Sequence, residues 1–401
     1  MKCRFAWSHL DFKKNGYAPC FRFKNYPEYW KLSGSDKFPS QVINNSDFIS
    51  VRQQLRNDEW PKGCIDCKRL ESEGLSSYRT RSLQEENDTS LSAEKAIFSP
   101  IDYRQDRVKI KDLQLKLSRA CNYNCRHCDS ASNSSFEKLG IEFPEIEQAL
   151  KTKYDFSHIS KAGNNKIVIP TKAVMDDLFE NVFPTVEQLE FSGGEPFYQI
   201  EMYKTLQRLI DDPNINTKKI YLVYNSNMSM LEYKGYSVKK LFPHFRAVSI
   251  TASMDGTGKL FNYFRTGGDY QNVVNNIKEL APYVHSFLFV CTTSAYQAFY
   301  MNEIYRDLRE LQESIPNLTT IRTTFVNWPK ALDIINLEEE TKNKIMENLE
   351  INDFTREFAI RLTSAKNEIK PCFKGLIKTQ DLLYDKSCQD MAPKIWEYAC
   401  S

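Results

Sequence analysis

Between residues 106 and 330, short apolar segments typical of β-strands alternate with longer segments typical of helices. Strand then helix, repeated about six times, predicts right-handed βαβ units and a parallel sheet. Six units are too few for a closed eight-stranded barrel, so we expect an α/β fold with a partial, TIM-like (β/α)6 barrel. Strands are expected at 112–118, 187–192, 219–225, 247–253, 286–292 and 320–326, and helices at 170–181, 201–211, 270–280 and 300–312.

The first two expected strands alternate polar and apolar side chains. Gln114, Lys116 and Ser118 alternate with leucines in the first strand, and Glu190 lies between two apolar residues in the second. Because helices cover the outside of a parallel barrel, we expect the polar sets to face the lumen. A half-exposed antiparallel sheet would show the same alternation, but helices follow both strands. An ion pair between Lys116 and Glu190 is expected across the neighbouring strands.

The flanking regions differ from this alternating zone in composition. The first is aromatic-rich and irregular with four cysteines, the next is polar and serine-rich, and the last is mainly helical in pattern. The predicted organisation is a small cysteine-rich domain at 1–75, a linker at 76–105, the barrel at 106–330 and a helical C-terminal extension at 331–401.

Composition narrows the class of protein and its surroundings. The formal net charge of +2 gives no global basic signature of a nucleic-acid binder, so we do not expect nucleic acid as a partner. We see neither an apolar run long enough for a bilayer nor a signal peptide, and we expect a cytoplasmic protein without a membrane partner. Eleven cysteines in a reducing compartment indicate metal binding or catalysis before disulfides.

A CxxxCxxC triplet, Cys121, Cys125 and Cys128, follows the first expected strand. Three thiolates in one loop suit three irons of a [4Fe–4S] cluster and leave the fourth iron open, as a catalytic site requires. The alternative is a zinc site with His127 as the fourth ligand. His127 adjoins Cys128, which makes joint chelation of one ion awkward.

With this triplet and the motifs that follow the later strands, the chain resembles the radical S-adenosylmethionine (SAM) superfamily. The segment 192–196 (SGGEP) is similar to the family's GGEP motif, 224–227 (YNSN) ends the third expected strand, and 253–256 (SMDG) resembles the S-x-D-G segment. The resemblance covers residues 106–330. It implies that the triplet's cluster cleaves SAM to a 5′-deoxyadenosyl radical, which abstracts a hydrogen atom from a substrate carbon. It also implies an electron donor such as flavodoxin or ferredoxin. The SAM contacts it implies are His127, Gly193, Gly194, Glu195, Asn225, Asn227, Ser253 and Arg265.

A second set of cysteines, Cys3, Cys20, Cys64 and Cys67, lies before the barrel. It is similar to the SPASM/twitch type of auxiliary-cluster domain, although in most relatives that domain follows the barrel. We expect one auxiliary [4Fe–4S] cluster, and a zinc ribbon on the same four residues is the alternative. Cys291, late in the fifth strand, is a candidate hydrogen-atom donor if it faces the lumen, although buried packing is the commoner role.

Two classes of function follow from these patterns. The first is a radical SAM enzyme acting on a peptide by crosslinking, epimerisation or oxidation, or alternatively on a sugar, nucleotide or other small metabolite. The peptide is a guess by analogy with relatives that carry SPASM/twitch domains. The second class is a non-catalytic zinc-binding interaction protein.

Overall fold

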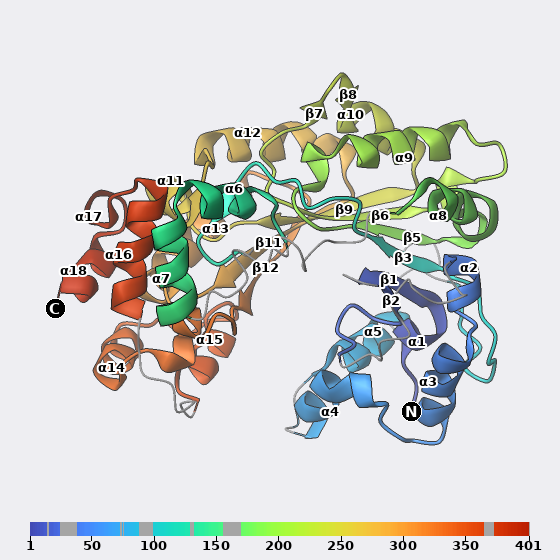
Figure 1. Ribbon diagram of the computed structural model, residues 1–401, viewed down its shortest axis with the longest axis horizontal. Helices are drawn as coiled ribbons and strands as arrows, with labels where there is room; N and C mark the ends of the chain where they lie inside the picture. The colour runs from blue at the N-terminus through green and yellow to red at the C-terminus, as the bar shows by residue number, and fades with distance from the viewer. Residues whose placement is uncertain are drawn as a thin grey trace.

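The computed structural model confirms the α/β class and the open parallel barrel (Figure 1). It describes residues 1–13, 16–24, 38–72, 74, 76–87, 99–128, 132–154, 170–364 and 373–400. One eight-stranded sheet has the order β12-β11-β9-β6-β5-β3-β1-β2. Six neighbouring parallel strands form the barrel part of this sheet: β3 (Asp112–Leu115), β5 (Gln188–Phe191), β6 (Tyr221–Ser226), β9 (Ala247–Ser253), β11 (Ser286–Thr293) and β12 (Leu318–Phe325). These are the six strands expected from the sequence.

Helices follow these strands, and those that follow β5 and β6 lie on the upper side of the sheet in Figure 1. An Asp269 side chain caps one of them by accepting from the backbone N–H groups of Gln271 and Asn272, as helix N-termini require. The helices of the barrel and its insertions are α6 (Ser135–Glu142), α7 (Pro144–Tyr154), α8 (Lys172–Asp177), α9 (Ile200–Asp211), α10 (Val238–Leu241), α11 (Gly258–Phe264), α12 (Tyr270–Leu280) and α13 (Met301–Glu313).

The polar and apolar faces of the first strands divide as expected. Leu113 and Leu115 have no exposed surface, whereas Gln114 donates 2.8 Å to Glu190 on the opposite, lumen face. The prediction of an ion pair between Lys116 and Glu190 is wrong. Lys116 Nζ instead lies 3.3 Å from Asp11 Oδ1, because an additional strand brings a carboxylate to the other side of β3.

That additional strand is β1 (His9–Lys13), which pairs in parallel with β3, while β2 (Gly16–Ala18) pairs antiparallel with β1. The N-terminal segment therefore extends the barrel sheet. Its helices are α1 (Arg4–Ser8), α2 (Pro39–Val42), α3 (Ser46–Arg56), α4 (Ile65–Ser72) and α5 (Tyr78–Asn87). They lie below one end of the sheet in Figure 1.

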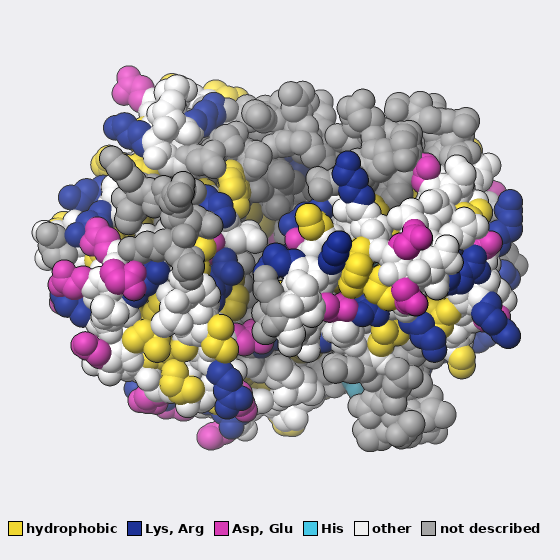
Figure 2. Space-filling view, turned by 90° about the horizontal axis from the view of Figure 1, so that it is seen from below, with side chains coloured by type: hydrophobic (Ala, Val, Ile, Leu, Met, Phe, Trp, Pro, Cys, Tyr) yellow, Lys and Arg dark blue, Asp and Glu magenta, His cyan; other side chains and the backbone are white. Residues whose placement is uncertain are grey.

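The C-terminal extension is helical, as expected, and lies below the other end of the sheet (Figure 1). Its helices are α14 (Glu339–Glu347), α15 (Arg356–Leu362), α16 (Phe373–Tyr384), α17 (Cys388–Met391) and α18 (Pro393–Cys400). Phe354, Phe358 and Phe373 are buried, whereas Trp396 is 37% exposed. Seen from below, basic, acidic and hydrophobic side chains are interspersed on both lobes (Figure 2). No helix in the described ranges has the length and apolar character to cross a membrane.

Candidate functional site

The cysteine triplet lies in the loop after β3, where a short ribbon holds it. Strand β4 (Asn124–Cys125) pairs antiparallel with β10 (Arg265–Thr266), which sets Arg265 opposite Cys125. The Cys128 N–H donates 3.0 Å to the carbonyl of Cys125, so the last two cysteines share a tight turn. Burial raises the pKa of the Cys125 thiol to about 11 and that of Cys121 to about 12. Thiols with pKa values this high become thiolates only when a bound cation compensates the charge.

Arg265 and Asp255 form a buried ion pair beside the triplet. Arg265 Nη2 lies 2.7 Å from Asp255 Oδ2, and its Nη1 donates 3.7 Å to the sulfur of Cys125. The other Asp255 oxygen accepts 2.7 Å from the Thr292 N–H, and His127 Nε2 lies 3.8 Å from Asp255 Oδ2. Asp255 thus connects the SMDG segment, Arg265 and His127. The sequence places Asp255 in the SMDG segment but does not indicate this role.

The glycine pair after β5 approaches the cysteine loop backbone to backbone. Gly193 and Gly194 have φ values of +83° and +55°, a region that glycine adopts without strain. The Glu195 N–H donates 2.8 Å to the carbonyl of Ala120. A Cβ at residue 194 would lie 2.2 Å from that same oxygen, so the approach requires glycine.

The Glu195 side chain accepts hydrogen bonds from three groups of the protein itself. Its carboxylate accepts from Ser226 Oγ at 2.8 Å, from the Asn227 N–H at 2.6 Å and from the Phe197 N–H at 3.0 Å. Burial raises its pKa to about 7 in spite of these donors. This carboxylate joins β5 to β6, and the expected contact of Glu195 with SAM stays a prediction.

The other expected SAM contacts gather at the same strand ends. Asn225 Nδ2 donates 2.9 Å to Glu190, and Asn227 Nδ2 donates 3.0 Å to Asn122 beside the triplet. Ser253 is half-buried at the end of β9. Ser192 Oγ is buried and has no hydrogen-bond partner among the described residues.

A charged cluster lies deeper in the lumen, partly built by β1. His9 Nδ1 is 3.1 Å and Arg4 Nη2 is 3.3 Å from Asp112 Oδ2, and all three side chains are buried. Burial lowers the pKa of His9, but the Asp112 carboxylate outweighs it and the net shift is upward. Sequence reasoning missed His9 and Asp11, although the alternation of HLDFK, polar at 9 and 11 and apolar at 10 and 12, was the available signal.

Glu190 leads to a pH-dependent prediction. Burial, then Asp112, raise its pKa from 4.5 to about 7. The folded state therefore retains a proton that the unfolded state releases between these values, and stability falls as pH rises through that interval. Glu190→Gln is expected to raise the melting temperature at about pH 8, where the buried charge is fully present, and to leave it nearly unchanged at about pH 5. Thermal unfolding at both pH values, with the exposed Glu232→Gln as control, tests this. Equal gains at both pH values would contradict it.

The four N-terminal cysteines line one cavity. Cys3, Cys20, Cys64 and Cys67 share its wall with Phe23 and the guanidinium side chain of Arg79, among others. Burial raises the pKa of Cys3 to about 11 and raises that of Cys64, and the neighbouring thiols add to both shifts. Across the described ranges, no three His, Cys, Asp or Glu side chains are arranged as they stand to hold a metal ion. The four cysteines thus share one cavity.

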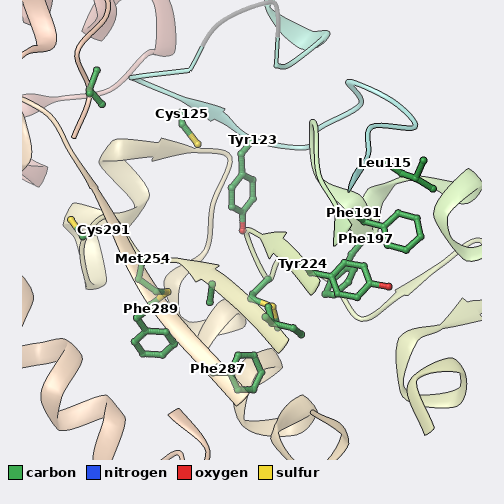
Figure 3. Packing of buried hydrophobic residues seen from close by; sticks show 14 of the residues in the cluster. Leu115, Tyr123, Cys125, Phe191, Phe197, Tyr224, Met254, Phe287, Phe289 and Cys291 are labelled. Atoms are coloured by element: carbon green, nitrogen blue, oxygen red, sulfur yellow. The ribbon is translucent and has the colours of Figure 1, made fainter. Parts of the chain in front are cut away.

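The position of Cys291 corrects the hypothesis that this cysteine faces the lumen and donates a hydrogen atom. It has no exposed surface and shares a strand face with Phe287 and Phe289, in the buried hydrophobic cluster shown in Figure 3. The lumen face of β11 presents Leu288 and Thr292 instead. A hydrogen-atom donor must reach the lumen, so this placement gives Cys291 a packing role. Cys388 is also buried, Cys400 is exposed, and Cys372 lies outside the described residues.

Arg126, inside the triplet, is buried against the C-terminal extension. Its guanidinium lies 3.7 Å from the centre of the Tyr263 ring and 2.7 Å from Asp381 Oδ1. Its carbonyl accepts 2.8 Å from Gln380 on α16. Breaking a buried ion pair of this kind is costly, so α16 fixes the middle of the cysteine loop. The sequence carried no signal for this contact.

Comparisons with known proteins place these features in a family context. Residues 115–296 match the model described as Radical SAM superfamily. The chain is 25% identical over 178 residues to the radical SAM cyclopropyl synthase TigE of Paramaledivibacter caminithermalis, which covers 43% of this chain and 32% of TigE.

Two solved structures show a limited likeness. Native anSMEcpe with bound AdoMet and Kp18Cys peptide is 19% identical, with a TM-score of 0.36 and 59% of each chain covered. Streptococcus suis SuiB bound to precursor peptide SuiA is 12% identical, with a TM-score of 0.32, covering 71% of this chain and 55% of SuiB. The chain spans about a third of the length of TigE and less than two thirds of each structure.

Proposed function

We propose that this chain is a radical SAM enzyme whose cluster is held by Cys121, Cys125 and Cys128. The observation that carries the proposal is the triplet's position, at the carboxyl ends of parallel strands, against the Arg265–Asp255 pair and the glycine edge. Active sites of parallel α/β barrels lie at that end of the strands. The match of residues 115–296 to the radical SAM model supports the same reading. When bound, the cluster and SAM supply the carbon-radical chemistry.

The residues present fit a cluster with bound SAM. The donor set is three thiols, and the raised pKa values of Cys121 and Cys125 mean that these two ionise only beside a compensating cation. The Gly194 backbone leaves no space for a side chain beside Ala120, so the glycine edge packs directly against the cysteine loop. Ser192 Oγ and Arg265 Nε are buried polar atoms without hydrogen-bond partners among the described residues, as expected of groups that face a ligand.

Each SAM-site residue has a distinct role in this proposal. Gly193 and Gly194 would offer backbone groups to SAM, and His127 would contact it from the cysteine loop. Asn225, Asn227 and Ser253 supply polar groups from the strand ends. Arg265 is held by Asp255 and so faces the cluster with a fixed orientation, which makes Asp255 a positioning residue. Glu195 acts through Asn227, whose backbone it holds.

We propose an auxiliary [4Fe–4S] cluster on Cys3, Cys20, Cys64 and Cys67. A cubane binds each thiolate on a different iron, whereas zinc draws all four ligands onto one ion. The four thiols line one cavity, which supports a single centre held by all four.

Replacing Cys64 with serine is expected to lower iron from about eight to about four atoms per chain, because one ligand of the auxiliary cluster is lost and the triplet is untouched. Elemental analysis after anaerobic purification measures this, and Cys400→Ser, at an exposed cysteine, is the control. Stoichiometric zinc in the unmodified protein, lost in the Cys64 variant, would show a zinc ribbon instead.

The proposed substrate is a peptide that is modified at carbon. The lumen below the SAM edge presents Glu190, Lys116 and Asn225, which suit the polar groups of a peptide. Anaerobic incubation with SAM, dithionite and a short peptide encoded beside the gene should change the peptide mass and yield 5′-deoxyadenosine in step. Product formation from sugars or nucleotides but not peptides would redirect the substrate assignment. Colourless protein with zinc in both cysteine sets would instead support a non-catalytic binding protein.

A further inference from the structure

Three acids, Asp11, Asp112 and Glu190, face the lumen on neighbouring strands, and Glu190 differs from the other two. Two basic side chains lie beside Asp112, and Lys116 Nζ lies 3.3 Å from Asp11 Oδ1. No basic side chain in the described ranges forms an ion pair with Glu190. Glu190 is half-buried, whereas Asp11 and Asp112 are fully buried. The acid that the lumen can reach is therefore the one whose charge the described chain leaves uncompensated.

The internal hydrogen bonds of Glu190 do not require its charge. Its Oε1 accepts from Gln114 Nε2 at 2.8 Å and from Asn225 Nδ2 at 2.9 Å. A glutamine at this position would offer a carbonyl oxygen to the same two donors. Burial, then Asp112, raise the pKa of Glu190 to about 7, so the charged form costs folding free energy. A residue that lowers stability without an internal partner is typical of a functional site.

Two acceptor atoms beside this charge have no donor among the described residues. Gln114 is 6% exposed, and its Oε1 is buried without a hydrogen-bond partner. Glu190 Oε2 receives no hydrogen bond from the described chain, because both amide groups donate to Oε1. An unpaired buried acceptor costs free energy, which indicates a donor from outside the chain. A primary ammonium group has three N–H donors and a positive charge, so it satisfies both acceptors and the carboxylate.

The acceptors lie just below the edge that the proposed function assigns to SAM. Ser192 comes two residues after Glu190 at the end of β5, so the two positions share a face and lie roughly 7 Å apart. Asn225, which donates to Glu190, is itself one of the expected SAM contacts. A cation bound at Glu190 would therefore bring the carbon chain attached to it towards the SAM edge.

We propose that Glu190, Gln114 and Asn225 bind a primary ammonium group of the substrate on the lumen face of the sheet. The inference rests on the proposed function, because it takes the lumen as the substrate chamber, and it narrows the substrate to one that carries an amine. In a peptide this group belongs to a lysine side chain or to the free amino terminus. The same three residues would hold either one.

Thermal unfolding of the purified holoprotein tests the ammonium site, because a ligand that binds the folded state raises the melting temperature. One probe, Nα-acetyl-lysine methylamide, carries only a side-chain ammonium, and a second, alanine methylamide, carries only an α-ammonium. The neutral match is Nα-acetyl-norleucine methylamide. At about pH 7.5 Glu190 is mainly charged and both ammonium probes are mainly protonated. At least one ammonium probe is expected to give a saturable rise that the norleucine derivative does not give.

Glu190→Gln is expected to weaken the binding of the ammonium probe at least about tenfold, since it removes the charge that holds the ammonium. The substitution keeps the shape of the side chain, and each variant is compared with its own melting temperature without probe. Glu232→Gln, at an exposed glutamate, is the matched control and should respond as the unmodified protein does.

The outcomes separate this inference from the proposed function. A rise with the lysine derivative, lost in Glu190→Gln, assigns a lysine side chain, and such a rise with alanine methylamide assigns an amino terminus. No rise in the unmodified protein, an equal rise with the norleucine derivative, or an equal rise in Glu190→Gln overturns the ammonium site. The measurement does not involve SAM cleavage. Absence of 5′-deoxyadenosine from the unmodified protein under dithionite would overturn the proposed function and leave the binding result intact.

Discussion

Replacing Cys125 with serine is expected to reduce 5′-deoxyadenosine formation from SAM to the assay background. Cys125 is the buried member of the triplet, opposite Arg265 in the β4–β10 ribbon, so its loss leaves two partly buried thiols for a cluster that needs three. Iron should fall by about four atoms per chain, and the iron of the N-terminal cysteines should remain. Iron analysis and chromatographic assay of 5′-deoxyadenosine under dithionite measure both effects.

A second cysteine variant controls for the general effect of losing a cysteine. Cys400→Ser, at an exposed cysteine of α18, should keep both the iron and the product. Product formation at the unmodified rate in the Cys125 variant would falsify the assignment of the triplet. Removal of all iron by this one substitution would instead mean that the N-terminal cysteines hold no iron of their own.

The sequence was sufficient to predict the barrel because its strands carry their own pattern. Ala247–Ser253 and Tyr270–Leu280 have the bounds that were expected, since hydrophobic periodicity and capping determine them locally. The motif glycines were also predictable, because positive φ and close approach leave few alternatives to glycine. The site residues gather as expected because parallel strands end at one edge.

The rest of the site depends on long-range contacts that leave no local pattern. Strand β1 joins β3 across more than a hundred residues, and so brings Asp11 to Lys116 where Glu190 was expected. The pairing of Asp381 with Arg126 is likewise invisible in sequence, because each residue is an ordinary charged residue in its own segment. Local reasoning predicts which groups are present in the lumen but not which partner each one takes.

The contact between Asp381 and Arg126 gives the helical C-terminal extension a structural role. Since α16 holds Arg126 in the middle of the triplet, the C-terminal region sets the position of the cysteine loop from one side. The glycine edge holds the same loop from the other side through Ala120. The loop is thus fixed at two points that flank Cys121 and Cys125, which is how a flexible run of residues becomes a rigid ligand set.

Gly194→Ala tests the second of these two points and is expected to have a large effect. The added Cβ would lie 2.2 Å from the carbonyl oxygen of Ala120 and 2.7 Å from the carbonyl carbon of Arg119, and backbone atoms yield only if the cysteine loop moves. The φ of +55° adds strain of about 1–2 kcal/mol, and overpacking typically adds about 1–3 kcal/mol. Because a displacement of about 1 Å in a site can cost about 100-fold in rate, 5′-deoxyadenosine formation should fall by about that factor.

Gly235→Ala separates the crowding from the backbone strain. Gly235, in the turn between β7 (Glu232–Tyr233) and β8 (Tyr236–Ser237), has a φ of +86°, yet a Cβ there would meet no atom within 4 Å. This variant should therefore lose only the strain part of the free energy of unfolding, about 1 kcal/mol, and keep its iron and its product. Unfolding curves, iron content and product formation of the two variants are compared side by side. If both variants behave alike, the glycine edge does not position the cysteine loop.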